Sequence, residues 1–500
     1  MILSSTLDSP LLSPNVRDWL AQPKRLLIAN RWVESVTGAS FSVIDPATGN
    51  LLCEVAEARA EDVDLAVAAA RRAMDGTWGS TTPAERARMI WKLADLLEEH
   101  QDEFGQLESL DVGKPILETM VFDLPQAIDQ LRYFAGWATK ITGETVQTSL
   151  PGESLAYTRR EPVGVVAAIT PWNFPLAIVC WKLAPALACG NAVVLKPSEI
   201  TPLSALRLGD LILEAGFPPG AINILPGFGA NAGHALVHHA GVDKISFTGS
   251  TRVGKEILQA SSLDFKRVTL ELGGKSPNII LPDADLDEAV GGAMSAIFFN
   301  QGEACVAGSR LFVPAGQRDA ILDRLLANIA SITQGVGLEP ETQMGPLVSS
   351  AHRDRVMGFI DRAKRDGSEM LTGGSRNTAL GDGFFVQPTV FMAKDESEIA
   401  QEEVFGPVLT VLSYENTDDL LARANASQYG LGAGIWTSDI KQGIRLAHTL
   451  KAGTVWINGY GMLDAALPWG GFKQSGIGRE MGSYALETYT EVKSVWVNLL

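Results

Sequence analysis

Cysteine is scarce in this chain of 500 residues, and its four cysteines are scattered, with no Cys-x-x-Cys pair. Disulfide frameworks and structural zinc sites need closely spaced cysteines, so neither is expected, and no other metal site is predicted. Dispersed free thiols are typical of a reducing compartment. We therefore expect a cytoplasmic protein.

Positive charge is also in short supply, because 41 lysines and arginines face 58 aspartates and glutamates, for a net charge of −17. A nucleic-acid partner needs basic patches that neutralise phosphates, so none is expected. A long uninterrupted apolar run is missing too. The most hydrophobic stretch, 163–195, is broken by Pro171, Asn173, Pro175, Lys182, Pro185 and Asn191. A membrane span needs about 20 mostly apolar residues, so a buried strand, loop and helix is expected instead.

The chain does contain a regular alternation of strand-like and helix-like segments. Short apolar runs predict strands at 163–169, 192–195, 222–225, 244–247 and 268–272. Helical periods lie between them, at 176–188, at 203–215, from a glycine-rich turn to about 239, and at 251–260. This alternation indicates βαβ units in a parallel sheet, with ligands at the carboxyl ends of the strands.

A second alternation begins after Gly273 and predicts another α/β domain. Strands are expected at 278–281, 311–313, 410–414 and 454–457, and helices at 286–299, 320–333, 351–365 and 418–426. Three helices are predicted before residue 142, at about 60–74, 83–108 and 123–141. The final segment, 489–500, alternates Val and Trp with polar residues, which is typical of an exposed or intermolecular strand.

Several predicted strand ends carry residues that suit a nucleotide. Gly249 and Ser250 follow a strand and open a helix, where backbone N–H groups favour a pyrophosphate, although a plain turn is an equal alternative. The glycine-rich turn around Gly229 has the same two interpretations. Glu199, just after Lys196, has a carboxylate that suits a ribose hydroxyl and repels a 2′-phosphate. A solvated turn is the alternative for that pair.

Three other residues suit covalent catalysis. Cys305 follows an apolar helix, and a thiolate is a good nucleophile, but a lone cysteine is more often buried and inert. Glu271 ends a predicted strand, as a general base or as an exposed side chain. Asn173 lies in a tight turn, where its amide can stabilise an oxyanion or simply hold the turn.

Taken in order, these segments closely resemble the aldehyde dehydrogenase superfamily, from 26–32 to the C-terminus. The resemblance is to its NAD-dependent members, and most to the broad-specificity and phenylacetaldehyde dehydrogenases. Seven motifs carry it: TPWNFP at 170–175, KPSE at 196–199, FTGST at 247–251, ELGGKSP at 271–277, NQGEAC at 300–305, EEVFGPV at 402–408 and PWGGFKQSG at 468–476.

The resemblance implies an enzyme that oxidises an aldehyde to an acid with NAD. Cys305 would be the nucleophile, Asn173 with the Cys305 N–H the oxyanion hole, and Glu271 the base that hydrolyses the thioester. Lys196 and Glu199 would hold the adenosine ribose. The full set implied for NAD is Thr170, Trp172, Lys196, Glu199, Gly229, Gly249, Ser250, Gly254, Leu272, Glu403 and Phe405.

It also implies an α/β fold in three parts. A Rossmann-like NAD-binding domain would comprise 22–142 and 162–273, and an α/β catalytic domain 274–474. A small β oligomerisation element, 143–161 with 475–500, would extend the catalytic sheet of a neighbouring subunit. We therefore expect a homodimer or homotetramer that acts on a small-molecule aldehyde.

The substrate pocket is implied at Phe174, Trp181, Val306, Tyr460 and Leu467. These side chains suggest an apolar tunnel for aromatic or medium-chain aldehydes. The segment 463–468 is similar to that of bacterial phenylacetaldehyde dehydrogenases.

Three alternatives within the resemblance remain. A semialdehyde dehydrogenase needs a cation for the second carboxylate, for which Arg310 or Arg160 are candidates. CoA-acylating relatives typically lack the base that Glu271 supplies. A structural, crystallin-like member would not need the intact set of Cys305, Glu271 and Asn173.

Overall fold

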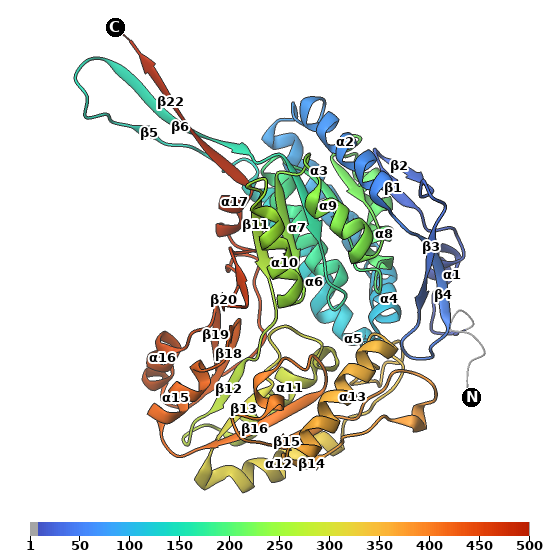
Figure 1. Ribbon diagram of the computed structural model, residues 1–500, viewed down its shortest axis with the longest axis vertical. Coiled ribbons are helices and arrows are strands. Elements are labelled where there is room, and N and C mark those ends of the chain that lie inside the picture. Colours follow the sequence, from blue (N-terminus) through green and yellow to red (C-terminus); the bar gives the residue numbers. More distant parts are fainter. Residues whose placement is uncertain (1–8, 500) are drawn as a thin grey trace.

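The computed structural model describes residues 9–499, which form two α/β domains and a projecting β arm (Figure 1). The first domain is built on an eight-stranded sheet in the order β2-β1-β9-β8-β7-β10-β11-β21. Its five central strands are parallel, as the alternation predicted. The strands are β1 (Leu26–Ile28), β2 (Arg31–Val33), β7 (Val165–Ile169), β8 (Ala192–Lys196), β9 (Ile222–Ile224), β10 (Lys244–Thr248), β11 (Arg267–Glu271) and β21 (Gly476–Ile477).

Helices pack on this sheet and bury its apolar strands. The stretch 163–195 forms β7, α7 and β8, and every residue of α7 is buried, which explains its apolar character on all sides. The helices are α1 (Pro14–Leu20), α2 (Ala60–Asp75), α3 (Pro83–Glu99), α4 (Gln101–Val112), α5 (Ile116–Glu118), α6 (Leu124–Trp137), α7 (Pro175–Ala188), α8 (Leu203–Ala215), α9 (His234–His238), α10 (Thr251–Ser261) and α17 (Tyr484–Thr488).

One local prediction in this domain is wrong. The single helix expected at 83–108 is two helices, because His100 leaves the helical backbone region between α3 and α4. The segment 26–32 forms the hairpin of β1 and β2, because Ala29 and Asn30 adopt φ of 50° and 60° and turn the chain. A second hairpin, β3 (Ser40–Ile44) with β4 (Leu51–Ala56), follows it.

The second domain contains a seven-stranded sheet in the order β14-β15-β16-β13-β12-β18-β19. Its strands are β12 (Pro277–Ile280), β13 (Arg310–Pro314), β14 (Glu369–Thr372), β15 (Thr389–Met392), β16 (Val408–Tyr414), β18 (Gly432–Trp436) and β19 (Thr454–Ile457), and its helices are α11 (Leu286–Phe298), α12 (Arg318–Ala330), α13 (Ser350–Arg365), α14 (Glu398–Gln401), α15 (Thr417–Asn425) and α16 (Ile440–Thr449). A short pair, β17 (Tyr429–Gly430) with β20 (Phe472–Lys473), lies beside it.

Strands β14, β15 and β18 were not predicted. β18 contains Gly432 and Gly434, which weaken a strand pattern. A side chain at Gly434 would come within 2.5 Å of the Tyr460 ring, so packing explains this glycine.

The arm is the three-stranded sheet β22-β6-β5, which projects away from both domains (Figure 1). It comprises β5 (Thr145–Val146), β6 (Ser154–Pro162) and β22 (Thr490–Asn498), with β6 and β22 antiparallel along their whole length. The segment 475–500 therefore contributes to two sheets, because β21 within it pairs with β11 of the first domain. Leu500 lies outside the described residues.

Within residues 9–499, no helix is both long and apolar enough to cross a membrane. The same part of the chain brings together no group of three or more His, Cys, Asp or Glu side chains that could hold a metal ion.

Candidate functional site

A cavity of about 240 Å³ lies where the carboxyl ends of β10 and β11 and the loop after β7 meet loops of the second domain. It gathers most of the catalytic and cofactor-binding residues predicted from the sequence. Its lining is Pro171, Trp172, Asn173, Ile178, Thr248, Gly249, Ser250, Glu271, Leu272, Gly273, Cys305, His352, Arg355, Glu403 and Phe405.

The loop that carries Cys305 is strained. After α11 ends at Phe298, Asn300 and Gln301 adopt φ of 49° and 55°, in the left-handed region that costs non-glycine residues on the order of 1–3 kcal/mol each. Gly302 follows at φ 75°, and a side chain there would come within 2.2 Å of the Gly406 carbonyl oxygen. Close packing against the loop at Gly406 therefore fixes this turn just before Cys305.

The environment of Cys305 favours the neutral thiol. Burial, and then the nearby carboxylates of Glu403 and Glu271, raise its pKa to about 12. The backbone N–H groups of Cys305 and Val306 oppose this shift. The thiol must therefore lose a proton before it can act as a nucleophile.

Asn173 presents an amide donor to this cavity. The side chain is buried, and its Nδ2 donates to the Glu303 carbonyl oxygen at 2.9 Å. An amide nitrogen carries two hydrogens. Because only one of them is used in this bond, the other is available to an oxygen held beside Cys305.

Glu271 ends β11, and both its carboxylate oxygens are buried without a hydrogen-bond partner among residues 9–499. Burial raises its pKa well above the ordinary value, and the nearby Glu480 adds to this rise. Lys182, which forms a buried ion pair with Glu480, acts in the opposite direction. An unpartnered carboxylate with a raised pKa is suited to accept a proton from a water or a thiol.

Two glycines after Glu271 let the second domain approach closely. A side chain at Gly273 would come within 2.2 Å of Glu403 Oε2, and one at Gly274 within 2.4 Å of the Cys305 carbonyl oxygen. The Gly274 N–H donates to Glu403 Oε1 at 2.9 Å. The two glycines thus bring the Cys305 loop and Glu403 against the strand end that carries Glu271.

The loop that carries Glu403 is clamped by helix α13. Arg355 donates to the carbonyl oxygens of Glu403 at 2.8 Å and Val404 at 2.5 Å, and His352 Nε2 lies 2.6 Å from that of Phe405. Phe405 has φ of 61°, and its ring contacts Trp172 edge-to-face with centroids 5.1 Å apart. Burial raises the pKa of Glu403 to about 7.

The residues expected at the adenosine ribose lie together beyond this cavity, at the ends of β8 and β9. Lys196 Nζ donates to the carbonyl oxygens of Pro197 and Gly227 and lies 3.4 Å from the Glu199 carboxylate. The Thr170 N–H bonds the Lys196 carbonyl oxygen at 3.1 Å. Gly229 opens the next turn, where an added side chain would meet no atom of the described residues within 4 Å.

Ser250 and Gly254 belong to the first turns of α10. The Ser250 side chain caps this helix by accepting from the Val253 N–H at 3.4 Å. A side chain at Gly254 would come within 2.6 Å of Leu272, so this glycine packs against the loop that follows β11.

A second cavity, of about 380 Å³, lies beside the nucleophile loop and is largely apolar. Of the described residues that line it, none carries a charge. The Tyr460 hydroxyl donates to the Val306 carbonyl oxygen at 2.6 Å. The lining is Val121, Phe122, Gln126, Ser295, Ala296, Phe299, Ala304, Val306, Ala307, Tyr460, Gly461, Met462 and Leu463.

Comparisons with known proteins show the family to which this chain belongs. A family model described as the aldehyde dehydrogenase family matches residues 32–495. The chain belongs to the aldehyde dehydrogenase family. The predicted family, fold class and enzyme class are therefore confirmed.

Curated and solved relatives match over almost their entire lengths. An aldehyde dehydrogenase of Emericella nidulans is 48% identical over 99% of this chain and 98% of its own. A phenylacetaldehyde dehydrogenase of Pseudomonas fluorescens is 46% identical over 99% of each chain. An aldehyde dehydrogenase from Bacillus cereus, solved as a complex with NAD, superposes with a TM-score of 0.96 at 50% identity, over 98% of this chain and 99% of that one.

Of the residues expected at the substrate, one is exposed, two pack in an apolar cluster, and two line the apolar cavity of this aldehyde dehydrogenase. Val306 and Tyr460 line it, and Phe174 stacks on the lining residue Phe299 with centroids 6.0 Å apart. Trp181 packs edge-to-face on Trp469, in the buried apolar cluster that also contains Phe174. Leu467 is 61% exposed and lines neither cavity.

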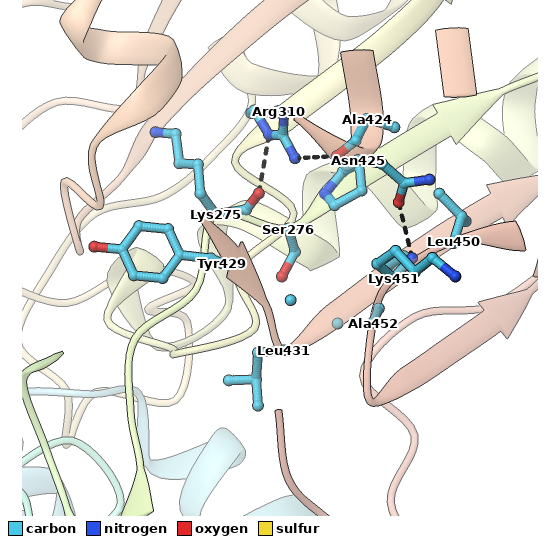
Figure 2. Close-up of a pocket in the computed structure, with 14 residues that line it drawn as sticks. Lys275, Ser276, Arg310, Ala424, Asn425, Tyr429, Leu431, Leu450, Lys451 and Ala452 are labelled. Atoms are coloured by element: carbon cyan, nitrogen blue, oxygen red, sulfur yellow. Dashed lines mark hydrogen bonds between the residues drawn. The ribbon is translucent and has the colours of Figure 1, made fainter. Parts of the chain in front are cut away.

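Neither arginine considered as a carboxylate anchor reaches the apolar cavity. Arg310 is buried, and its guanidinium donates to the carbonyl oxygens of Lys275 and Ala424, each at 2.9 Å (Figure 2). Arg160 lies in the arm, where it donates to Thr490 Oγ1 at 3.2 Å. The two cations that the sequence offered for a semialdehyde are thus used elsewhere.

Sequence reasoning missed several residues of the site. His352 and Arg355 lie on an ordinary amphipathic helix, and no local motif marks them. Phe122 and Phe299 enter the cavity wall from segments far apart in the chain. Only Phe299 had a sequence signal, since it precedes the Cys305 motif directly.

Proposed function

We propose that this aldehyde dehydrogenase oxidises an aldehyde to a carboxylic acid with NAD, through a thioester on Cys305. The observation that carries the proposal is the convergence of a thiol, an amide donor and an unpartnered carboxylate on one cavity. Each comes from a different segment of the chain, and all three match the roles that the chemistry needs. Solved relatives with bound NAD support the cofactor.

The residues present fit NAD. The first turn of α10 contains no acidic side chain, and the buried Thr248 hydroxyl beside it has no partner among residues 9–499, so this end suits a pyrophosphate. Lys196 and Glu199 would hold the adenosine ribose, and Glu403 the nicotinamide ribose. When bound, NAD supplies the acceptor for the hydride that leaves the substrate carbon.

The first chemical step forms a carbon–sulfur bond. Glu271 accepts the proton of the Cys305 thiol, and the sulfur attacks the carbonyl carbon while the carbonyl π electrons move to oxygen. The Asn173 amide and the Cys305 N–H donate to that oxyanion. A preorganised donor of this kind contributes roughly 3–4 kcal/mol to the stability of the transition state.

Loss of a hydride from the tetrahedral carbon, for which NAD would supply the acceptor, would turn this adduct into a thioester, and the next step hydrolyses that thioester. After Glu271 has released the thiol proton to solvent, it takes a proton from water as the water oxygen attacks the acyl carbon. The carbon–sulfur bond then breaks, and Cys305 leaves as a thiolate. The single carboxylate thus serves in both halves of the reaction, which fits its lack of a fixed partner.

The uncharged lining of the 380 Å³ cavity favours aromatic or medium-chain aldehydes. Burying a second carboxylate there without a partner would cost several kcal/mol. A semialdehyde substrate is therefore disfavoured. The similarity to a phenylacetaldehyde dehydrogenase supports an arylacetaldehyde.

A panel of aldehydes, followed by NADH absorbance, tests this substrate class. We expect kcat/KM for phenylacetaldehyde and hexanal to exceed that for succinic semialdehyde by at least about a hundredfold, since about 1.4 kcal/mol corresponds to each tenfold. Turnover should not require CoA. A semialdehyde as the best substrate, or a requirement for CoA, would contradict the proposal.

The charge of Glu199 predicts the choice between NAD and NADP. A carboxylate about 4 Å from a phosphate is repelled by roughly 1 kcal/mol in bulk water and by several at an effective dielectric near 20. We expect kcat/KM to favour NAD by roughly ten- to a hundredfold. Glu199→Ser should narrow the gap by improving NADP use, and Glu341→Ser, at an exposed position of the second domain, should not. A wild-type preference for NADP would refute this role.

The arm supports a proposal about assembly. Its outer strand β22 is largely exposed and includes the apolar residues Val492, Trp496 and Val497. An exposed apolar edge strand is a template for pairing with another chain. We propose that it extends the catalytic sheet of a second copy, in a dimer or tetramer, so the molar mass in solution should be at least twice that of one chain.

A further inference from the structure

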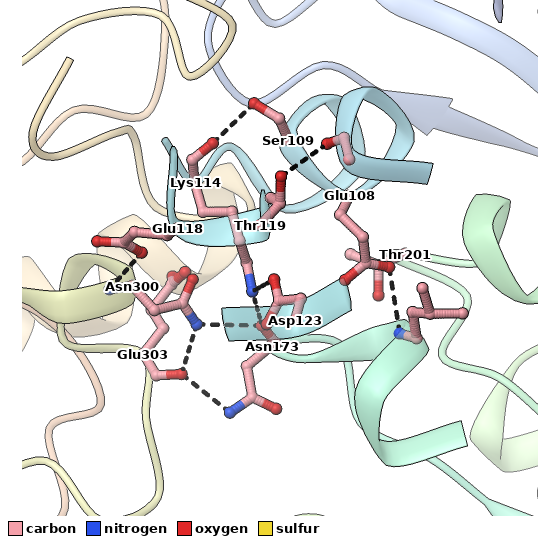
Figure 3. Close-up of polar contacts among 12 residues, drawn as sticks. Glu108, Ser109, Lys114, Glu118, Thr119, Asp123, Asn173, Thr201, Asn300 and Glu303 are labelled. Carbon is pink, nitrogen blue, oxygen red and sulfur yellow. Dashed lines mark hydrogen bonds and ion pairs between the residues drawn. The ribbon is translucent and has the colours of Figure 1, made fainter. Parts of the chain in front are cut away.

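A buried lysine lies behind the oxyanion donor (Figure 3). Lys114 lies in the loop after α4, and its side chain is 1% exposed. Its Nζ donates to the Asn173 backbone carbonyl oxygen at 2.9 Å and to Asp123 Oδ2 at 2.8 Å. The ammonium also lies 4.2 Å from the centroid of the Phe174 ring. Lys114 thus contacts the backbone of Asn173 from outside the cavity.

A second amide joins the same carbonyl group to the nucleophile loop. Asn300 Nδ2 donates to the carbonyl oxygens of Asn173 and Glu303, each at 3.0 Å. Asn173 Nδ2 donates to that same Glu303 oxygen, so the two segments are linked in both directions (Figure 3). Glu118 completes the set by accepting from the Asn300 N–H at 2.9 Å.

This arrangement limits how the Asn173 amide can move. Its carbonyl oxygen is held by Lys114 and Asn300, and its side chain by Glu303. Rotation of the Asn173 peptide would break the first two bonds together. Because an oxyanion donor must be held in place before the reaction, such a clamp has a direct effect on the barrier.

We propose that Lys114 is a positioning residue, which holds the Asn173 peptide so that its amide meets the developing oxyanion. The inference rests on the proposed function, in which Asn173 stabilises that oxyanion. Stability alone accounts poorly for this lysine, because a buried ion pair can often be replaced by apolar residues without loss of folding free energy. The hydrogen bond from Lys114 to the Asn173 carbonyl oxygen explains why a cation lies at this position.

The test is Lys114→Met, which keeps the length of the side chain and its contact with Phe174 but removes the charge and the donors. We expect the single-turnover rate of NADH formation to fall by about ten- to a hundredfold, somewhat less than the loss of a whole oxyanion donor. An aldehyde deuterated at the carbonyl carbon should show a larger isotope effect than in the wild type, and the Kd for NAD should change little. An unaltered rate and isotope effect would overturn the proposal.

The matched control is Lys24→Met. Lys24 is also a buried lysine whose ammonium binds backbone carbonyl oxygens and lies 4.1 Å from the centroid of a Trp19 ring, but it is next to β1 at the other end of the first sheet. This variant should lower the melting temperature without changing the isotope effect. Equal kinetic effects of the two substitutions would show that loss of a buried cation is merely structural, and would overturn the proposal.

A double-mutant cycle separates the inference from the proposed function. Asn173→Ala alone should slow NADH formation by about 10²–10³-fold, and failure here counts against the function. In the Asn173→Ala background, Lys114→Met should cost less than about threefold, because the group that it positions is gone. The same loss in both backgrounds would refute positioning while leaving the function intact.

If Lys114→Met does not fold, Asn300→Asp can take its place in the double-mutant cycle with Asn173→Ala. Aspartate has the same shape and tolerates the left-handed backbone at this position, but it presents oxygen instead of a donor to two carbonyl oxygens. The substitution should slow NADH formation, and again by little once Asn173 is alanine. A wild-type rate in Asn300→Asp would contradict the clamp.

Discussion

Replacement of Cys305 by alanine should abolish NADH formation, with a loss of at least about 10⁴-fold in kcat. The substitution removes the sulfur that is proposed to form a covalent bond with the aldehyde carbon. It should leave NAD binding measurable by calorimetry, because the expected dinucleotide contacts lie on β8, α10 and the Glu403 loop. A variant that retains more than about one per cent of the activity would contradict the nucleophile.

Cys180 and Cys189 provide matched controls for that experiment. Both are buried in or directly after α7, and burial raises the pKa of each thiol. Neither lines the catalytic cavity. Replacing either by alanine should change the melting temperature more than kcat, whereas Cys305→Ala should do the reverse.

Glu271→Gln is expected to slow hydrolysis of the thioester more than its formation, because the thiol can also lose its proton to solvent, whereas the attacking water needs a base. The amide keeps the shape of the side chain but cannot accept a proton from water. Stopped-flow absorbance should therefore show a burst of NADH close to one equivalent per active site, followed by a steady state slower by about 10²–10⁴-fold. No burst together with an unaltered steady state would contradict the base.

The pH dependence follows from the same carboxylate. A base works in its deprotonated form, and the pKa of Glu271 is raised well above the ordinary value, first by burial and then by Glu480. Activity should therefore fall as the pH drops through a pKa higher than that of an ordinary glutamate, and it should be fully present above that value. In Glu271→Gln this acid limb of the steady-state profile should disappear, so an unchanged limb would assign the titration to another group.

Much of the fold could be predicted where local pattern and packing agree. The helix expected at 203–215 is α8, and it ends at Gly216, whose φ of 87° suits a left-handed C-cap. The parallel strands β7 to β11 were predicted because buried strands are apolar throughout. β18 was not predicted because the Tyr460 ring requires a glycine at position 434, and this contact between distant residues is not visible in a local pattern.

The three residues proposed for catalysis could be singled out because each lies at or after the end of an element and belongs to a distinctive motif. The groups that hold these three residues in place could not be predicted from the sequence. Lys114 and His352 carry no motif, and their role depends on contacts across domains or distant segments. The exposed position of Leu467 and the use of Arg310 by backbone carbonyls likewise depend on the tertiary arrangement.

The most direct test of the central claim is to trap the acyl group on Cys305. Glu271→Gln is mixed with phenylacetaldehyde and NAD, quenched in acid within the burst, and analysed by intact and peptide mass spectrometry. The account predicts a mass increase equal to one phenylacetyl group in place of a hydrogen, on the peptide that contains Cys305. No adduct during a full NADH burst, or an adduct on another residue, would contradict it.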